Sequence, residues 1–140
     1  MLANKKAFTM LEMMLVLLII SVILGITLIS IKSFDTKNTL NQVAKTITSR
    51  YELSRSLAES NHTDCYLSLN DNTIKVECDN QVKSERKLPK GVTISTNYRK
   101  NSIKMNKNGH VARAGTITVN YKDGSKQIKI GIGKGDITIK

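Results

Sequence analysis

Residues 5–31 read KKAFTMLEMMLVLLIISVILGITLISI, and the fold depends on this stretch. From Met13 to Ile31 there are nineteen residues without a charged side chain, nearly all of them Leu, Ile, Val or Met. As an α-helix this run is about 28 Å long, close to the ~30 Å hydrocarbon core of a bilayer. Because Lys5 and Lys6 precede the run, the positive-inside rule predicts a cytoplasmic N-terminus and an extracytoplasmic C-terminal part.

The remainder of the chain is hydrophilic and basic. The 140 residues contain 22 Lys and Arg against 11 Asp and Glu, a formal net charge of +11. Setting aside Lys5, Lys6 and Glu12 leaves 20 basic and 10 acidic side chains after the apolar run. This composition excludes a polytopic membrane protein, a disordered polymer and a collagen-like repeat. We therefore expect one membrane-length helix joined to one small hydrophilic domain.

Glu12 is the acidic residue at the start of the apolar helix. A carboxylate in such a segment costs on the order of several kcal/mol unless it is paired. A secretory signal peptide does not fit, because its apolar region has only about 7–15 residues and a small-residue cleavage site follows. A plain single-pass anchor fits the length of the run but leaves Glu12 unexplained.

Residues 5–12, KKAFTMLE, followed by an apolar helix, resemble the class III leader of type IV pilins and pseudopilins. The resemblance implies that a prepilin peptidase cuts between Ala7 and Phe8 and N-methylates Phe8. It also implies that Glu12, the fifth residue of the mature chain, pairs with the free amine of a neighbouring subunit during filament assembly. Two positions depart from the usual pattern, because the family commonly has Gly at Ala7 and Leu at Met10.

A second periodicity follows Lys32. Small and apolar side chains recur at spacings of three and four, which gives a helix one apolar face: Leu40, Val43, Ala44, Ile47, Tyr51, Ser54, Leu57 and Ala58. The pattern ends at Asn61, and no proline precedes Pro89. The sequence thus predicts one helix from about Thr9 to about Ser60, with its second half packed on a sheet.

Residues 64–78 alternate in the pattern of a β-hairpin with its turn at residues 70–73. The alternation opposes three pairs: Leu69 with Ile74, Leu67 with Val76, and Cys65 with Cys78. Directly opposed Cβ atoms lie ~4.5–5.5 Å apart, which is compatible with a disulfide, and disulfides persist outside the cytoplasm. The alternatives are two buried thiols, or a metal site formed by these cysteines with His62 and Asp64.

The C-terminal part has further β signals at residues 92–96, 103–105, 117–121 and 137–139. The strongest is Asp123-Gly124, which predicts a hairpin that opposes Val119 with Ile128 and Ile117 with Ile130. Residues 131–135, GIGKG, lack the order of a phosphate-binding loop, so we interpret them as a bend in the sheet.

The predicted fold class is α+β, with a long N-terminal helix packed on a small antiparallel β-sheet, as in pilins. The predicted organisation has four parts: a leader peptide at 1–7, an apolar membrane or filament-core helix at 8–31, its amphipathic continuation at 32–61, and a β-rich extracytoplasmic domain at 62–140.

Positive charge is concentrated between Lys83 and Lys107, where Glu85 is the one acid among eight basic residues. These eight are the candidates for binding a polyanion: Lys83, Arg86, Lys87, Lys90, Arg99, Lys100, Lys104 and Lys107. Their density suits DNA, teichoic acid or an anionic membrane face. The alternative is a solvated loop with edge strands that lysines keep soluble.

The sequence has no recognisable catalytic motif, and neither His62 nor His110 lies in one. We therefore expect a non-enzymatic protein without a cofactor. The chain is similar to ComGD-type pseudopilins of Gram-positive competence machines, which implies a minor subunit supporting pilus assembly and uptake of transforming DNA. The implied partners are other pilin-like subunits, a prepilin peptidase and the membrane, with DNA as a candidate. The alternatives are a type II secretion pseudopilin, a minor type IV pilin of the FimT/GspH kind, or a membrane-anchored polyanion-binding module without a filament.

Overall fold

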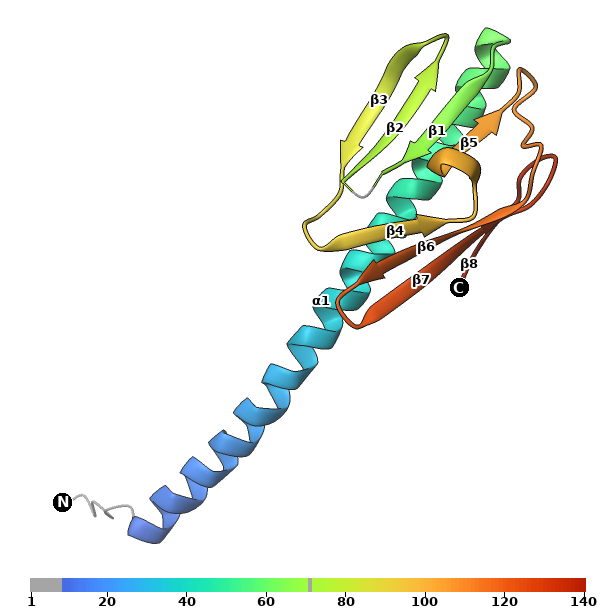
Figure 1. Ribbon diagram of the computed structural model, residues 1–140. Helices are drawn as coiled ribbons and strands as arrows, with labels where there is room; N and C mark the ends of the chain where they lie inside the picture. Colours follow the sequence, from blue (N-terminus) through green and yellow to red (C-terminus); the bar gives the residue numbers. More distant parts are fainter. Residues whose placement is uncertain (1–8, 71) are drawn as a thin grey trace, which may run out of the picture. The chain divides into compact units, whose positions relative to one another are not determined.

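The computed structural model describes residues 9–70 and 72–140, and the side chains of residues 27–34 also lie outside its description. Helix α1 spans Met10–Asn61. The elements after it, shown in Figure 1, are β1 (Cys65–Leu69), β2 (Thr73–Cys78), β3 (Gln81–Lys87), β4 (Val92–Thr96), the 3₁₀ turn η1 (Arg99–Asn101), β5 (Ser102–Met105), β6 (Gly115–Tyr121), β7 (Gly124–Ile130) and β8 (Ile137–Ile139). The chain divides into two compact units between Asp35 and Thr36.

In the first unit, the described large apolar side chains of α1 are all exposed. Their exposed fractions run from 44% at Val16 to 82% at Met10. Among the described residues, none of the helical segments combines the length and the apolar character that crossing a bilayer requires.

In the second unit, one face of α1 forms part of the core. The predicted face is confirmed, because seven of its eight residues are buried and Leu57 is partly buried against them. Ser54, a buried polar side chain of this face, donates its hydroxyl to Met105 Sδ at 3.0 Å. The helix ends where His62 adopts φ 50°, and the N–H of Thr63 then closes on the carbonyl of Ala58 at 3.3 Å. This is the left-handed termination that satisfies the last carbonyls of a helix.

The predicted α+β class, a long helix followed by antiparallel strands, is confirmed, but the described strands form two four-stranded sheets where one sheet was expected. Their strand orders are β3-β2-β1-β5 and β4-β6-β7-β8, and Figure 1 shows both beside this part of α1. The chain passes between the two sheets after β3, after β5 and, through η1, between β4 and β5. Between β4 and β5, Lys100 and Asn101 have φ 58° and 50°, and this left-handed backbone turns the chain away from the sheet of β4. The apolar alternation of the two strands does not reveal this turn.

The first hairpin has the predicted register. Strand β1 opposes Leu69 with Ile74, Leu67 with Val76 and Cys65 with Cys78 on β2. Strand β3, however, was missed by the sequence analysis. Six of its seven residues are exposed, so its sequence QVKSERK lacks the apolar alternation that marks a half-buried strand.

The predicted register of the second hairpin is wrong by two residues. The structure opposes Ile117 with Ile128 and Val119 with Lys126, and the two turn residues are Lys122 and Asp123. Lys122 takes the positive φ, 51°, that the turn requires. Gly124 instead begins β7, where an added Cβ would lie only 2.9 Å from Leu40 Cδ1 and Thr36 Cγ2 of α1. This glycine therefore allows β7 to approach the helix closely.

The predicted bend between the last two strands is confirmed. Gly133 and Gly135 have φ 77° and 67°, and Gly133 pairs with Val111. The buried hydroxyl of Tyr51 donates to the carbonyl of Gly135 at 3.0 Å. Burial raises the pKa of Tyr51 to about 12, because the ionised phenol would lose its hydration. Helix α1 thus holds this bend by a hydrogen bond inside the core.

Candidate functional site

The start of α1 is a reciprocal capping box between Thr9 and Glu12. The backbone N–H and the hydroxyl of Thr9 donate to Glu12 Oε2 at 3.0 and 3.1 Å. In return, the N–H of Glu12 donates to Thr9 Oγ1 at 3.3 Å. The first turn closes with a bond of 3.2 Å from the N–H of Met13 to the carbonyl of Thr9. These contacts match the T-x-x-E pattern of a helix N-terminus.

The capping box gives Glu12 a local role that the sequence analysis did not consider. A carboxylate at the third helical position satisfies a backbone donor that would otherwise lack a partner, and it faces the positive end of the helix dipole. Glu12 therefore stabilises the N-terminus of the helix within a single chain. The predicted cleavage residues, Ala7 and Phe8, lie outside the described residues.

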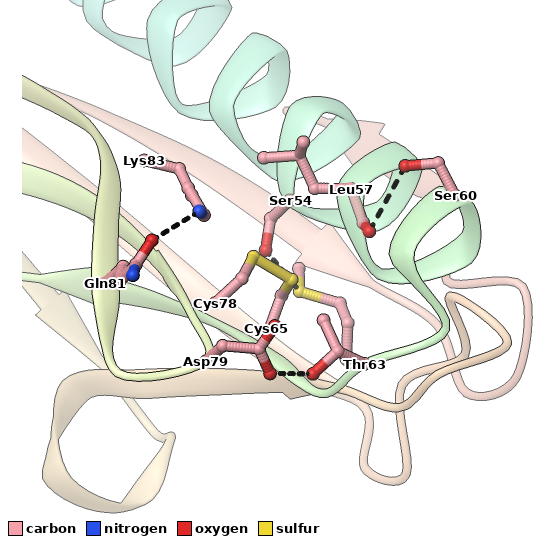
Figure 2. The surroundings of a disulfide bond; sticks show 10 residues. Ser54, Leu57, Ser60, Thr63, Cys65, Cys78, Asp79, Gln81 and Lys83 are labelled. Carbon is pink, nitrogen blue, oxygen red and sulfur yellow. Dashed lines mark hydrogen bonds between the residues drawn. A yellow bond between two sulfur atoms is a disulfide. The ribbon is translucent and has the colours of Figure 1, made fainter.

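A disulfide joins Cys65 of β1 to Cys78 of β2, as their predicted opposition favoured. The two Cα atoms lie 4.4 Å apart, and both residues are fully buried. Figure 2 shows the bond close to Ser54 of α1, with a hydrogen bond from the Thr63 hydroxyl to Asp79 beside it. Both thiols are consumed, which overturns the alternative metal site. Within the described residues, no group of three or more His, Cys, Asp and Glu side chains is placed to hold a metal ion.

The eight basic residues that were predicted to bind a polyanion do not form one surface. Three lie on β3, at one edge of the sheet: Lys83, Arg86 and Lys87. Three lie on η1 and β5, at the opposite edge: Arg99, Lys100 and Lys104. The other two, Lys90 and Lys107, are exposed residues of turns. Because β2 and β1 separate the two edges, a stretch that is continuous in sequence becomes two separate groups.

The β3 group is divided and partly neutralised. Arg86 stands opposite Ile74 in the ladder and Lys87 opposite Thr73, so their side chains leave opposite faces of the sheet. The one acid of this strand, Glu85, precedes Arg86, and its Oε1 lies 3.7 Å from Lys75 Nζ on β2. We conclude that this edge carries a mixture of charges.

The β5 group lines an open surface pocket, which we call the β5-edge pocket. Its lining residues are Tyr66, Arg99, Lys100, Ser102 and Lys104. The ammonium of Lys104 lies 2.6 Å from Asp64 Oδ2 and 5.8 Å from the centroid of the Tyr66 ring. The hydrogen bond that Lys104 donates to the carboxylate of Asp64, together with the attraction of that negative charge, raises the pKa of Lys104. Lys104 is thus paired, whereas no ion pair joins Arg99 or Lys100 to an acid in residues 9–70 and 72–140.

The sequence analysis missed two residues of the pocket, Ser102 and Tyr66. Tyr66 lies outside the basic stretch, but the pairing of β1 with β5 sets it opposite Lys104. Its ring points outward because its neighbours on β1, Cys65 and Leu67, are both buried. The alternation of β1 could have shown that Tyr66 faces outward. Only the pairing of two strands distant in sequence shows which charges it meets.

Comparison with known proteins finds a family match for the N-terminal residues and a structural match for the fold. Residues 2–28 match the family described as the prokaryotic N-terminal methylation motif. The fold is similar to the crystal structure of the type IV minor pilin FimU from Pseudomonas aeruginosa, with a TM-score of 0.61 and 14% sequence identity. That similarity covers 76% of this chain and 92% of the FimU chain. A search of curated protein sequences finds no significant match. The chain therefore carries a pilin-type methylation motif and has the α+β fold of a pilin.

Proposed function

We propose that this chain is a minor pilin-like subunit of a type IV pilus, and that the pilus is the competence machine that takes up transforming DNA. The observation that carries the pilin-like part of the proposal is the joining of an N-terminal methylation motif to a pilin fold through the single helix α1. The competence part rests on the similarity of residues 5–12 and of the chain's modest length to ComGD-type pseudopilins. The exposed apolar side chains from Met10 to Ile26 support the pilin-like part, because a surface of this kind needs lipid or other helices to cover it.

The proposal includes a processing step at the membrane. A prepilin peptidase cuts between Ala7 and Phe8 and methylates the new terminus at Phe8. The precursor is a single-pass membrane protein with residues 62–140 outside the cytoplasm, and the mature subunit reaches the cell surface in the filament. The buried disulfide supports this placement, because such bonds persist in oxidising compartments.

Glu12 has two successive partners in this proposal. In the single chain, its carboxylate accepts hydrogen bonds from Thr9. In the filament, it also meets the free amine of a neighbouring Phe8, because opposite charges at low dielectric are far more stable together than either is alone. The capping box survives cleavage, since Thr9 lies after the cut and keeps its backbone N–H.

Two substitutions separate these roles. Glu12→Ala removes both the cap and the charge, whereas Thr9→Val removes the hydroxyl partner and leaves the carboxylate. We expect Glu12→Ala to insert and be processed but to abolish incorporation into filaments. We expect Thr9→Val to assemble, with a loss of only about 0.5–2 kcal/mol of helix stability. The measurement is recovery of the subunit in sheared filaments by immunoblot.

Equal assembly defects in the two variants would show that capping alone explains Glu12 and would contradict the pairing. Processing has its own measurement, the intact mass of the mature chain. We expect it to lack residues 1–7 and to gain the mass of one methyl group, and we expect Ala7→Leu to leave an uncut precursor. An unmethylated, full-length chain in mature filaments would overturn the processing step.

The competence role is tested separately from filament assembly. Deletion of the gene is expected to abolish transformation by added DNA while protein secretion continues. Loss of secretion with normal transformation would favour a type II secretion pseudopilin. The likeness to FimU favours the other filament alternative, a minor type IV pilin of the FimT/GspH kind, for which loss of surface pili without loss of transformation is the signature. Full function of Glu12→Ala would instead favour a membrane-anchored polyanion-binding module.

A further inference from the structure

The β5-edge pocket combines unpaired positive charge with an exposed aromatic ring. We propose that it binds a single strand of nucleic acid, with phosphates on Arg99 and Lys100 and a base against Tyr66. The inference deepens the proposed function and rests on it for the expected source of the ligand, which is incoming DNA. The binding itself is argued from the pocket.

The charge of the pocket comes from two adjacent side chains on one turn. Arg99 and Lys100 are both exposed, and the positive φ of Lys100, 58°, turns the backbone at this point. A guanidinium donates two parallel hydrogen bonds to a phosphate, and an ammonium adds a point charge. Asp64 is already bound to Lys104, and within the described residues no ion pair joins Arg99 or Lys100 to an acid.

The uncharged groups of the pocket select among polyanions. Tyr66 is 39% exposed and lies on the outer face of the sheet. Ser102, which pairs with Ser68 on β1, adds a hydroxyl on the same face as Tyr66. Aromatic rings stack on nucleic-acid bases, and this stacking is strongest for unpaired bases that can turn out of the strand. A polymer of glycerol phosphate has no ring to stack, so Tyr66 favours nucleic acid as the ligand.

The ion pair between Lys104 and Asp64 offers a way to change the number of free positive charges in the pocket. Lys104 is held by Asp64 on one side and lies over the Tyr66 ring on the other. Removing the negative charge of Asp64 frees Lys104 as a third phosphate-binding group. Asp64→Asn is therefore expected to strengthen binding, a result that a solvated surface of unconnected charges would not produce.

The experiment uses the full-length chain in mild detergent and a fluorescent single-stranded oligonucleotide, with affinity measured by anisotropy at several salt concentrations. We expect Arg99→Glu with Lys100→Glu to weaken binding at least about tenfold and to reduce the salt slope by about 1.4, the value for two phosphate contacts on a single strand. The matched control is Lys83→Glu with Lys87→Glu, which makes the same charge change on exposed β3 residues. We expect the control to lose less than about threefold.

Tyr66→Leu tests the aromatic contact. Loss of one stacked base is expected to weaken single-strand binding about fivefold or more and to leave duplex binding nearly unchanged. Arg99→Gln with Lys100→Gln repeats the charge test with a smaller perturbation, and a thermal melt of each variant confirms that it is folded.

Three outcomes would overturn the proposal. In the first, the control variant Lys83→Glu with Lys87→Glu loses as much affinity as Arg99→Glu with Lys100→Glu does, which means that affinity follows net charge alone. In the second, polyglycerol phosphate competes as well as the oligonucleotide does, and Tyr66→Leu has no effect. In the third, Asp64→Asn leaves affinity unchanged. Recovery of the Arg99→Glu, Lys100→Glu variant in sheared filaments tests the proposed function separately. We expect this variant to assemble normally whether or not the pocket binds nucleic acid, so a loss of assembly would point to the proposed function and not to the pocket.

Discussion

The two parts of α1 have the same backbone structure and opposite surroundings. From Met10 to Ile26 the helix is apolar around nearly its whole circumference, and its large side chains are exposed. From Leu40 to Ala58 it is apolar on one face only, and that face is buried in the second unit. A one-sided helix packs on its own sheets, whereas an all-round apolar helix requires lipid or neighbouring chains. The side chains of the first part are therefore left uncovered in the single chain, whereas the apolar face of the second part is covered within its own unit.

The largest expected effect tests this division directly. Ile47→Ala removes a fully buried side chain from the second part and is expected to cost about 4 kcal/mol of unfolding free energy. The matched substitution is Ile19→Ala, at a residue that is 48% exposed, and it is expected to leave the unfolding free energy of the β-domain unchanged within about 0.5 kcal/mol. Chemical denaturation of both variants makes the comparison, and equal losses would contradict the division.

The disulfide is expected to have the next largest effect. Replacing both Cys65 and Cys78 by Ser opens a loop closed over a sequence separation of 13, which is expected to cost about 3 kcal/mol. The loss should appear in the denaturation of the second unit and leave processing at the N-terminus unchanged. A double variant as stable as the native chain would show that packing alone holds β1 to β2.

A smaller effect is expected at Tyr51. Tyr51→Phe removes the hydrogen bond to Gly135 and is expected to cost about 1 kcal/mol at neutral pH. The pKa of Tyr51 rises from 10.0 to about 12 in the folded chain, so the unfolded chain ionises first and the native protein loses stability as pH rises from about 10 to 12. Denaturation at several pH values should show a shallower alkaline loss for Tyr51→Phe. If the unfolding free energy falls equally steeply with pH in both proteins, another group is responsible for the alkaline loss of stability.

Local patterns predicted the elements that have a buried face. The spacing from Leu40 to Ala58 gave the packed face of α1, and the alternation of residues 65–78 gave the register of the first hairpin and the opposition of its cysteines. Strand β3 could not be found in this way, because it is an edge strand with almost no buried side chain. Hydrogen bonds to β2 make β3 a strand, and the sequence of β3 does not predict them.

The turn at Asp123-Gly124 shows how a correct signal can be placed wrongly. Asp-Gly is a strong hairpin signal, but the turn uses Lys122 and Asp123, and Gly124 serves the contact with Leu40 and Thr36. The shift is by an even number of residues in register, so Ile117 and Ile128 stay on the buried face. The pattern of side chains was thus predicted correctly while the pairing was not.

The sequence by itself determined the apolar run that begins at Met13, the methylation motif over residues 2–28, and the opposition of Cys65 and Cys78. These features depend on neighbours in the chain or on short-range periodicity. Only the tertiary structure decided that the strands form two sheets, that six of the eight basic residues between Lys83 and Lys107 divide between two edges of one sheet, and that Tyr66 joins Arg99, Lys100 and Lys104. The physical reason is that strand pairing between β1 and β5 acts between residues far apart in sequence, where no local pattern can specify a partner.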